Sequence, residues 1–246
     1  MSLRHFNSKH IKLDKVDSTN AYLQQLNKKN KQSCGTSLSA VFQTNGRGQK
    51  GAKWEVLSGE NLTFSVLVYP DILPKYAFYL NIITTLSIQK TLADLKIDSK
   101  IKWPNDILVD KKKICGVLIE NQISGLRISQ SVIGIGLNVN QSKFNDSLKA
   151  TSLLLQGVSI EIEDVLKQIY GYLDFYYNLL IESNFDLLLK HYYSNLLWLN
   201  KMGVFENQFG RFNATVIGIT DVGMLNLMLG DGTKKAYDLK EVKFIY

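Results

Sequence analysis

The feature that constrains the fold most is a series of strand-like segments that follow one another closely between residues 99 and 139. SKIKW, DILVD, KICGVLIEN and LRISQSVIGIGLNV are rich in β-branched and other apolar residues, and short turns separate most of them. Strands joined by short turns pair as antiparallel neighbours, whereas parallel strands need a long crossover, usually a helix. This region is therefore predicted to form an antiparallel or mixed sheet, which argues against a Rossmann fold with its helix after each strand.

Further strand and helix patterns lie on both sides of this region. Strand patterns occupy residues 10–16, 37–43 and 61–70, and apolar residues at helical spacing mark residues 75–95, 160–182 and 185–199. The segment DSTN, residues 17–20, consists of residues that favour the N-cap of a helix, so a helix is expected to start there. One residue is enough for a cap, and on position alone DSTN is a helix start and nothing more.

The chain changes character at about residue 200, where short strands joined by tight turns begin. GRFNATVIGIT, GMLNLML, DGTKKAYDL and KEVKFIY carry the strand patterns. They predict a small β-barrel of about 45 residues, which is too small to be stable alone and is expected to pack on the main domain. The predicted division is a domain of residues 1–200 followed by a domain of residues 201–246.

Charge and cysteine content limit the class of protein. The chain has 29 Lys and Arg against 22 Asp and Glu, and its net charge of +7 suits nucleic acid, a phosphate-bearing substrate or an acidic protein partner. No apolar run is long enough to cross a membrane and the start lacks a secretory signal, so a cytoplasmic location is expected. Cys34 and Cys115 are too few for a disulfide framework and lack zinc-site spacing, so both are expected to be reduced thiols.

The stretch GRGQKGAKW, residues 46–54, combines three glycines with three basic residues. Glycines at 46, 48 and 51 permit positive φ, so consecutive N–H groups could point at one anion as a nest, and Arg47, Lys50 and Lys53 would add charge. The stretch does not match the P-loop pattern, and it precedes a strand rather than a helix. An anion-binding loop and a basic surface turn both explain it.

The second constellation is KWPND, residues 102–106, followed by DKKKICG, residues 110–116. A proline turn with a solvated lysine run is the simplest explanation. Asn105 and Asp106 could instead bind a hydrated metal, a ribose or amide groups, and a lysine of the run could stabilise a carboxylate that turns into an acyl phosphate. Lys113 is favoured for that role because it abuts the apolar strand ICGVLIE, whereas its two neighbours are expected to face water.

The third constellation is VIGIGLNVN, residues 132–140, in which Gly134, Gly136 and Asn138 lie on one face of a strand. Glycines there leave room for a flat group against the sheet, although tight helix packing would explain them as well. The three histidines, His5, His10 and His191, form no arrangement suited to catalysis.

Together, DSTN, QTNGRGQKGAKW, GENLTFS, KWPNDILVDKKKICG and IGIGLNVN resemble the catalytic domain of biotin protein ligases in order and separation, over residues 10–200. The C-terminal segment is similar to the small SH3-like domain that ends this family. The resemblance implies an α+β fold of the class II aminoacyl-tRNA synthetase type, with a mixed, largely antiparallel sheet covered by helices and a small C-terminal SH3-like β-barrel.

The resemblance also implies a two-step reaction. Biotin attacks the α-phosphate of ATP to give biotinyl-5′-AMP and pyrophosphate, and a lysine of a biotin carboxyl carrier protein then displaces AMP. Both steps develop negative charge that needs fixed cations and donors. The family usually works with Mg²⁺, which would screen the triphosphate, and no metal-binding residue is assigned.

Site residues follow by position in the matched motifs. The resemblance implies biotin contacts for Ser18, Thr19, Asn20, Gln43, Gly46, Arg47, Gly48, Gln49, Lys113, Gly116, Gly134 and Gly136. It implies ATP or adenylate contacts for Lys50, Trp54, Lys102, Asn105, Asp106 and Asn138. Lys113 and Arg47 are expected to be catalytic: Lys113 meets the reacting carboxylate and phosphate, and the loop of Arg47 forms a flap over the bound acid.

One position departs from the family's pattern. Members often have a second arginine where this chain has Gln49. Glutamine donates hydrogen bonds but carries no charge, so Lys50 or Lys53 would have to balance the adenylate phosphate, or the intermediate would be held less tightly.

The chain begins almost at DSTN, so the N-terminal winged helix-turn-helix of the family's regulatory branch, and with it DNA repression, is not expected. The expected partner is the biotin carrier of a carboxylase rather than nucleic acid or a membrane, and a homodimer is left open. A lipoate or octanoate ligase is the nearest alternative, and a basic nucleic-acid-binding module built on the C-terminal strands is a more distant one.

Overall fold

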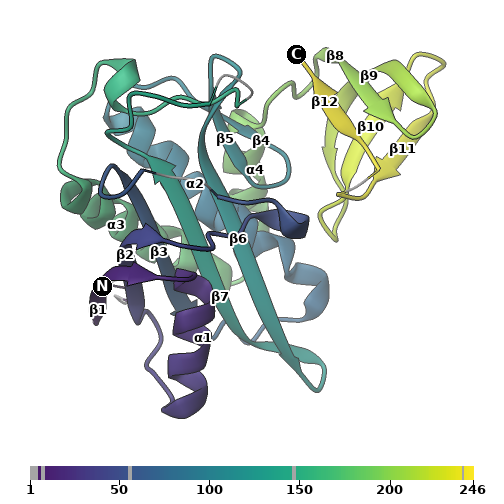
Figure 1. Cartoon of the computed structure of the whole chain (residues 1–246). Coiled ribbons are helices and arrows are strands. Elements are labelled where there is room, and N and C mark those ends of the chain that lie inside the picture. The colour runs from purple at the N-terminus through teal and green to yellow at the C-terminus, as the bar shows by residue number, and fades with distance from the viewer. Residues whose placement is uncertain (1–4, 7–8, 55–56, 146–147, 240) are drawn as a thin grey trace.

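The computed structural model describes residues 5–6, 9–54, 57–145, 148–239 and 241–246, and the side chain of Lys50 lies outside this description. A seven-stranded sheet forms the centre, in the order β1-β2-β3-β7-β6-β5-β4 (Figure 1). Its strands are β1 (His10–Val16), β2 (Ser37–Gln43), β3 (Asn61–Val68), β4 (Lys100–Lys102), β5 (Asp106–Val109), β6 (Lys112–Ser124) and β7 (Arg127–Asn138). β1 and β2 run parallel and the other neighbouring pairs antiparallel, which confirms the predicted mixed, largely antiparallel sheet.

Helices cover both faces of this sheet. They are α1 (Thr19–Lys29), α2 (Phe78–Asp94), α3 (Ile162–Ile181) and α4 (Phe185–Asn195), with short 3₁₀ turns η1 (Gln49–Gly51), η2 (Pro74–Tyr76) and η3 (Leu154–Gln156). The main apolar core joins α2, α3 and α4 to one face, and Leu23 of α1 packs on Leu67 and Val132 from the other (Figure 1). Every residue of β3 is buried because both of its faces are covered. The predicted helices are thus confirmed, with Ser18 as the N-cap of α1.

A second sheet of five antiparallel strands follows, in the order β11-β10-β9-β8-β12 (Figure 1). Its strands are β8 (Met202–Asn207), β9 (Gly210–Ile219), β10 (Leu225–Leu229), β11 (Lys234–Tyr237) and β12 (Lys243–Ile245). The sequence pattern missed β8, whose segment MGVFEN offers only two strong strand formers. Trp103 Nε1 donates to Gly223 O at 2.8 Å, so the turn before β5 is tied to the second sheet.

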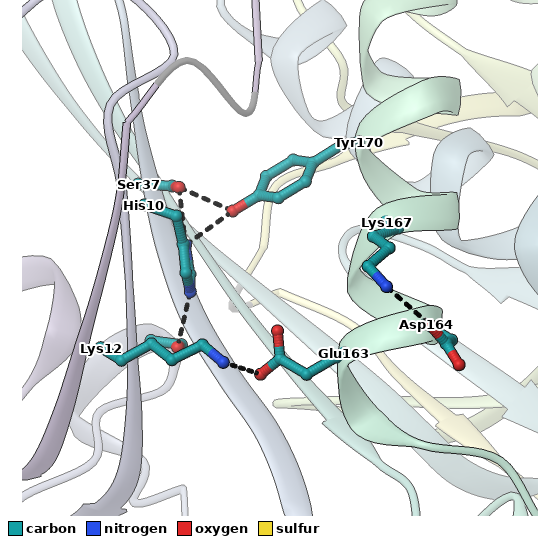
Figure 2. A network of polar contacts seen from close by, with 8 residues as sticks. His10, Lys12, Ser37, Glu163, Asp164, Lys167 and Tyr170 are labelled. Atoms are coloured by element: carbon teal, nitrogen blue, oxygen red, sulfur yellow. Dashed lines mark hydrogen bonds and ion pairs between the residues drawn. The ribbon is translucent and has the colours of Figure 1, made fainter.

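A polar network fastens the edge strand β1 to β2 and α3 (Figure 2). The two ring nitrogens of His10 lie 2.9 Å from Ser37 Oγ and Ser39 Oγ, and the hydroxyl of Tyr170 on α3 lies 3.0 Å from His10 Nδ1. Burial lowers the pKa of His10 and raises the pKa of Tyr170 to about 12. The imidazole is therefore a neutral structural group, in keeping with the lack of a histidine-based catalytic motif.

Both cysteines are free thiols, as predicted. Cys115 on β6 is buried in the core, and burial raises the pKa of its thiol. No helix in the described ranges is long and apolar enough to cross a membrane.

Candidate active site

A cavity of about 230 Å³ lies at the end of α1 nearest the central strands. The N-terminal end of α1, the end of β2, the loop of residues 46–54, the start of β5, and parts of β6 and β7 form its walls. Most of the predicted site residues line it: Ser18, Thr19, Asn20, Gln43, Arg47, Gly48, Gln49, Trp54, Asn105, Asp106, Lys113, Gly116, Gly134 and Gly136. The structure therefore brings the separate motifs together around one space.

Strand register explains why these motifs meet. Gly116 of β6 pairs with Asp106 of β5 on one side and with Gly136 of β7 on the other. Gly134 in turn lies opposite Ser65 of β3. Paired positions on neighbouring strands share a face of the sheet, so each pairing adds a residue to the same wall.

Lys113 occupies the charged end of the cavity. Its Nζ lies 2.6 Å from Asp106 Oδ1 and 5.5 Å from the centroid of the Trp54 ring. Asp106 also faces Lys102, whose Nζ lies 3.7 Å from Asp106 Oδ2. The backbone of Lys113 is held in β6 and accepts a 2.9 Å hydrogen bond from Thr151 N. The backbone of Lys113 is thus fixed, and its ammonium group pairs with the carboxylate of Asp106.

The loop of residues 46–54 closes on itself as a small hairpin. Trp54 N donates to Gly46 O at 2.9 Å, and Arg47 and Lys53 form an antiparallel bridge. A Cβ at position 46 would lie 2.4 Å from Trp54 O, so the close approach of the two chain segments requires glycine there. The hairpin directs the basic residues Arg47 and Lys53 toward the cavity, which both of them line.

Some of the backbone N–H groups that an anion nest would need are already used in this loop. Gly48 N donates to Ala52 O at 2.6 Å, and Ala52 N donates to Gln49 O at 3.1 Å. These N–H groups are used inside the hairpin and are not free for an anion. Of the three glycines only Gly51 has a positive φ, of 83°. The side chains of Arg47 and Lys53, which line the cavity, are therefore the loop's clearest candidates for contact with negative charge.

The two glycines of β7 lie beneath side chains that line the cavity. A Cβ at Gly136 would lie 2.3 Å from the Trp54 indole, and a Cβ at Gly134 would lie 2.4 Å from Asn20 Oδ1. An indole from the loop, and not a helix, therefore explains the glycine at 136. Trp54 Nε1 is buried and has no hydrogen-bond partner among the residues described. A flat ligand can lie on Gly136 only if the indole moves.

Uncharged hydrogen-bonding groups form the other end of the cavity. Gln43 Oε1 accepts from Thr19 N at 2.8 Å and from the Thr19 hydroxyl at 3.1 Å. Asn20 Nδ2 donates to Leu118 O at 3.3 Å. Thr19 and Asn20 are 4% and 3% exposed, so these groups are held far more tightly than the lysines opposite them.

A sequence model of the Biotin/lipoate A/B protein ligase family matches residues 13–138, which is more than half of the chain. The chain belongs to this family. The matched residues run from β1 to the end of β7 and include all the strand motifs that meet at the cavity.

Individual relatives agree with the assignment. The chain is 33% identical to the bifunctional ligase/repressor BirA of Bacillus subtilis, over 82% of this chain and 64% of that protein. It is also 33% identical to a biotin--[acetyl-CoA-carboxylase] ligase of Mycobacterium tuberculosis, over 51% of this chain and 47% of that one. The chain thus matches about half to two thirds of the length of these relatives.

A solved structure matches nearly the whole fold. The biotin protein ligase of Aquifex aeolicus, in complex with biotin and ATP, superimposes with a TM-score of 0.79 and 27% identity. The match covers 97% of this chain and 99% of that chain. It therefore includes the second sheet as well as the first, and confirms the predicted α+β fold with a C-terminal β-rich part.

In this family member, a few predicted residues stand outside the cavity lining. Gly46 closes the loop hairpin, and Lys102 points toward the rings of Phe244 and Tyr246, each 5.8 Å from its Nζ. Asn138 Nδ2 donates to the backbone carbonyl of Thr151 at 2.9 Å, so it anchors the segment beside Lys113. The side chain of Lys50 lies outside the described residues.

The cavity lining of this ligase-family chain also contains residues that sequence reasoning did not assign. They are Ala52, Lys53, Val117, Leu118 and Ile135. The sequence suggested for Lys53 only a charge that could balance the adenylate phosphate. The other four side chains are apolar and suggest no chemical role. Their positions next to Trp54, Gly116 and Gly134 are the only hint that the sequence offers.

The residues present do not form a resident magnesium site. Asp106 supplies the only carboxylate in the described cavity wall, and it faces Lys113 and Lys102. Across the described part of the chain, no three His, Cys, Asp or Glu side chains gather as metal ligands. Mg²⁺ would therefore enter together with ATP. This geometry does not support the alternative in which Asn105 and Asp106 hold a hydrated metal.

Proposed function

We propose that this chain is a biotin–protein ligase that activates biotin with ATP and transfers it to a lysine of a biotin carboxyl carrier protein. The observation that carries the proposal is the division of one cavity into an uncharged hydrogen-bonding end at Thr19 and Gln43 and a cationic end at Lys113 and Arg47. Biotin has the same division, because it joins an uncharged bicyclic urea to a carboxylate. The relatives named as biotin ligases support the assignment.

In the first proposed step, a carboxylate oxygen of biotin attacks the α-phosphorus of ATP. The bond between the α-phosphorus and the bridging oxygen breaks, pyrophosphate leaves, and biotinyl-5′-AMP remains. Lys113 and Arg47 balance the negative charge that gathers on the phosphate, and fixed cations in a partly enclosed site are effective at this. Asp106 holds Lys113 at 2.6 Å before the substrate binds, and the phosphate then takes over as its partner.

In the second proposed step, the neutral amine of the acceptor lysine attacks the acyl carbon of the adenylate. The bond from this carbon to the AMP oxygen breaks, AMP leaves with the electron pair, and the amine loses a proton to solvent. Trp54, Asn105 and Asp106 take the nucleotide side of the cavity, with Gln49 and Lys53 near the phosphate. The indole of Trp54 leaves Gly136 when the substrate enters.

The same family includes ligases for lipoate, whose acyl chain is linear. The uncharged end favours biotin, because Thr19 and Gln43 offer hydrogen bonds that an apolar chain cannot use and would leave unsatisfied. An ATP–pyrophosphate exchange assay with both acids separates the two activities. Preference for lipoate or octanoate would overturn the choice of biotin.

The proposal extends to the organisation of the chain and its partner. Residues 1–200 form the catalytic domain and residues 201–246 a second domain. The activity belongs in the cytoplasm, where ATP and the carboxylases that use biotin are present. The partner is the carrier domain of such a carboxylase rather than nucleic acid or a membrane.

The direct test is to incubate the protein with biotin, ATP and Mg²⁺ and to search for biotinyl-5′-AMP by mass spectrometry. A purified carrier domain is then added, and its mass is expected to rise by one biotinyl group at a single lysine. Absence of both products, with a folded protein, would refute the proposed function.

A further inference from the structure

Lys102 carries a charge beside the candidate active site but does not line its cavity. It lies on β4 directly opposite Asp106 of β5, because the two strands pair in antiparallel register. Its Nζ lies 3.7 Å from Asp106 Oδ2, and the two side chains are 25% and 17% exposed. In the part of the chain that the structure describes, Asp106 is the one carboxylate that forms an ion pair with Lys102. Lys102 is therefore placed to act on the site through Asp106.

Asp106 stands between two lysines, which meet different oxygens of its carboxylate. Lys113 Nζ lies 2.6 Å from Oδ1, and Lys102 Nζ lies 3.7 Å from Oδ2. Oδ1 is buried and has no partner with hydrogen-bond geometry among the residues described, so charge rather than a directed hydrogen bond holds Lys113 there. The ammonium group of Lys113 can therefore turn to another anion without breaking a directed bond.

Aromatic rings of the second sheet hold Lys102 in its place. Its Nζ lies 5.8 Å from the ring centroids of both Phe244 and Tyr246, which is within the range of a cation–π contact. Trp198 packs on both rings, with its centroid 5.5 Å from that of Phe244 and 6.0 Å from that of Tyr246. Lys149 Nζ donates a hydrogen bond to Tyr246 O. The rings that Lys102 faces are thus themselves held by neighbouring residues.

The first step of the proposed reaction changes the charges around Asp106. The phosphate and Asp106 are both anions and compete for the ammonium group of Lys113. Once Lys113 has turned to the phosphate, the buried Oδ1 of Asp106 would lie unpaired beside a second negative charge. A poorly solvated charge that loses its partner is costly, and two like charges repel each other. A second cation is therefore needed at Asp106 while Lys113 acts on the phosphate.

We infer that Lys102 is a positioning residue, which serves as the counterion of Asp106 when Lys113 turns to the phosphate. The rings of Phe244 and Tyr246 keep it close to Asp106 and out of the cavity. The inference rests on the proposed function. It replaces the expected contact of Lys102 with ATP by a role that Lys102 performs through Asp106, and it connects the second sheet to the charged end of the cavity.

The test measures binding by titration calorimetry, so that the readout does not depend on catalysis, for two ligands that differ in charge. One is a stable analogue of biotinyl-5′-AMP, in which a phosphodiester joins the alcohol derived from biotin to adenosine. The other is that alcohol alone, which is uncharged and should leave Lys113 with Asp106. Lys102→Met keeps the length of the side chain and removes its charge. It should weaken binding of the analogue about tenfold, the low end of the effect of one neighbouring charge, and leave binding of the alcohol unchanged.

A double-mutant cycle decides whether Lys102 acts through Asp106. In an Asp106→Asn background no carboxylate needs a counterion, so most of the effect of Lys102→Met should disappear. Lys102→Arg keeps the positive charge and should bind the analogue as the wild type does. Lys100→Met is the matched control, because Lys100 lies on the same strand and pairs with the exposed Asp98 at 3.9 Å.

A second pair of variants addresses the rings that hold Lys102. Tyr246→Leu removes one ring and should weaken binding of the analogue in the same direction as Lys102→Met, whereas Tyr246→Phe keeps the ring and should not. The effect of Tyr246→Leu should also disappear in the Asp106→Asn background. Thermal melts establish that each variant folds, and if Lys102→Met does not fold, the two Tyr246 variants decide.

The outcomes separate the inference from the proposed function. An equal loss from Lys102→Met in the wild-type and Asp106→Asn backgrounds would show that Lys102 meets the ligand directly, and would overturn the inference. An equal loss for both ligands, or no loss for either, would overturn it as well. A folded wild-type protein that binds neither ligand would refute the proposed function, and the inference with it.

Discussion

The two ends of the cavity are built in opposite ways. At the uncharged end, Thr19 and Asn20 are 4% and 3% exposed and sit at the start of α1. At the charged end, the side chains of Lys113 and Asp106 keep 36% and 17% of their surface exposed. Recognition of an uncharged ring needs donors and acceptors held in fixed directions, whereas a phosphate that arrives and leaves needs cations that water can also reach. Under the proposed function, this difference separates binding specificity from chemistry within one cavity.

Replacing Lys113 by alanine is expected to give the largest effect. It tests the charged end of the cavity alone. Biotin-dependent ATP–pyrophosphate exchange should fall by about 10²–10³-fold, because a cation near the reacting phosphate is lost. Biotin binding without ATP should change much less. Lys112→Ala is the matched control, since Lys112 is an exposed neighbour on β6. Exchange at the wild-type rate in Lys113→Ala would remove Lys113 from the mechanism.

Replacing Thr19 by valine should give the converse result at the uncharged end. Loss of a buried hydroxyl costs about 1–3 kcal/mol, so biotin affinity should fall by about 10- to 100-fold. The exchange rate at saturating biotin should change little, which separates binding from chemistry. Thr91→Val on α2 removes another buried hydroxyl, far from the cavity, and serves as the control. A collapse of the saturated rate in Thr19→Val would contradict the division between the two ends.

Replacing Gln49 by arginine should strengthen the binding of the adenylate at the charged end. The new cation lines the cavity and would meet the adenylate phosphate, so release of biotinyl-5′-AMP should slow by about tenfold, for a gain of ~1.4 kcal/mol. The measurement is the dissociation rate of preformed, labelled adenylate in an excess of unlabelled biotin and ATP. An unaltered rate would mean that Gln49 is not placed to act on the phosphate.

The smallest effect is expected at His10, which does not line the cavity and belongs to the polar network of Figure 2. Burial is the main cause that lowers its pKa below the ordinary value near 6.5, with Lys12 adding to the lowering and Glu163 opposing it. The unfolded chain therefore binds this proton first, and the free energy of unfolding should decrease as the pH falls through about 6.5. The decrease should level off below the lowered pKa.

The check for His10 is urea unfolding at about pH 7.5 and about pH 5.5, with His10→Gln beside the wild type. The variant should lose part of the pH dependence, and Lys12 and Glu163, paired at 2.7 Å, remain in both proteins. Biotin binding should be the same in both at the higher pH. Parallel pH profiles for the two proteins would show that His10 does not contribute.

Local patterns in the sequence predicted the mixed sheet and the helices, whereas the resemblance to the ligase family implied that the motifs meet at one site. Close spacing of strands favours antiparallel pairing. The register seen in the structure then places Asp106, Gly116 and Gly136 side by side. The first strand of the second sheet, β8, was missed because its residues carry little local strand preference, although it forms a hairpin with the adjoining β9 and also pairs with β12.

For the loop of residues 46–54, local reasoning suggested more free groups than the structure has. Its glycines suggested free backbone amides, yet the structure uses Gly48 N and Trp54 N to close a hairpin. The space over Gly136, predicted for a flat ligand, holds the Trp54 indole. Composition indicates which groups are available for a ligand, but only the folded loop shows which of them are already occupied.

The sequence by itself determined the antiparallel pairing of the central strands and the types and charges of the residues available to the cavity. Tertiary structure alone decided which groups meet at its uncharged end. Glu120 and Asn20 are 100 positions apart and meet only because β6, β7 and β3 lie side by side beneath α1. A residue's type gives its donors and acceptors, but the groups that it meets depend on the neighbours that burial leaves it, and those are set by the fold.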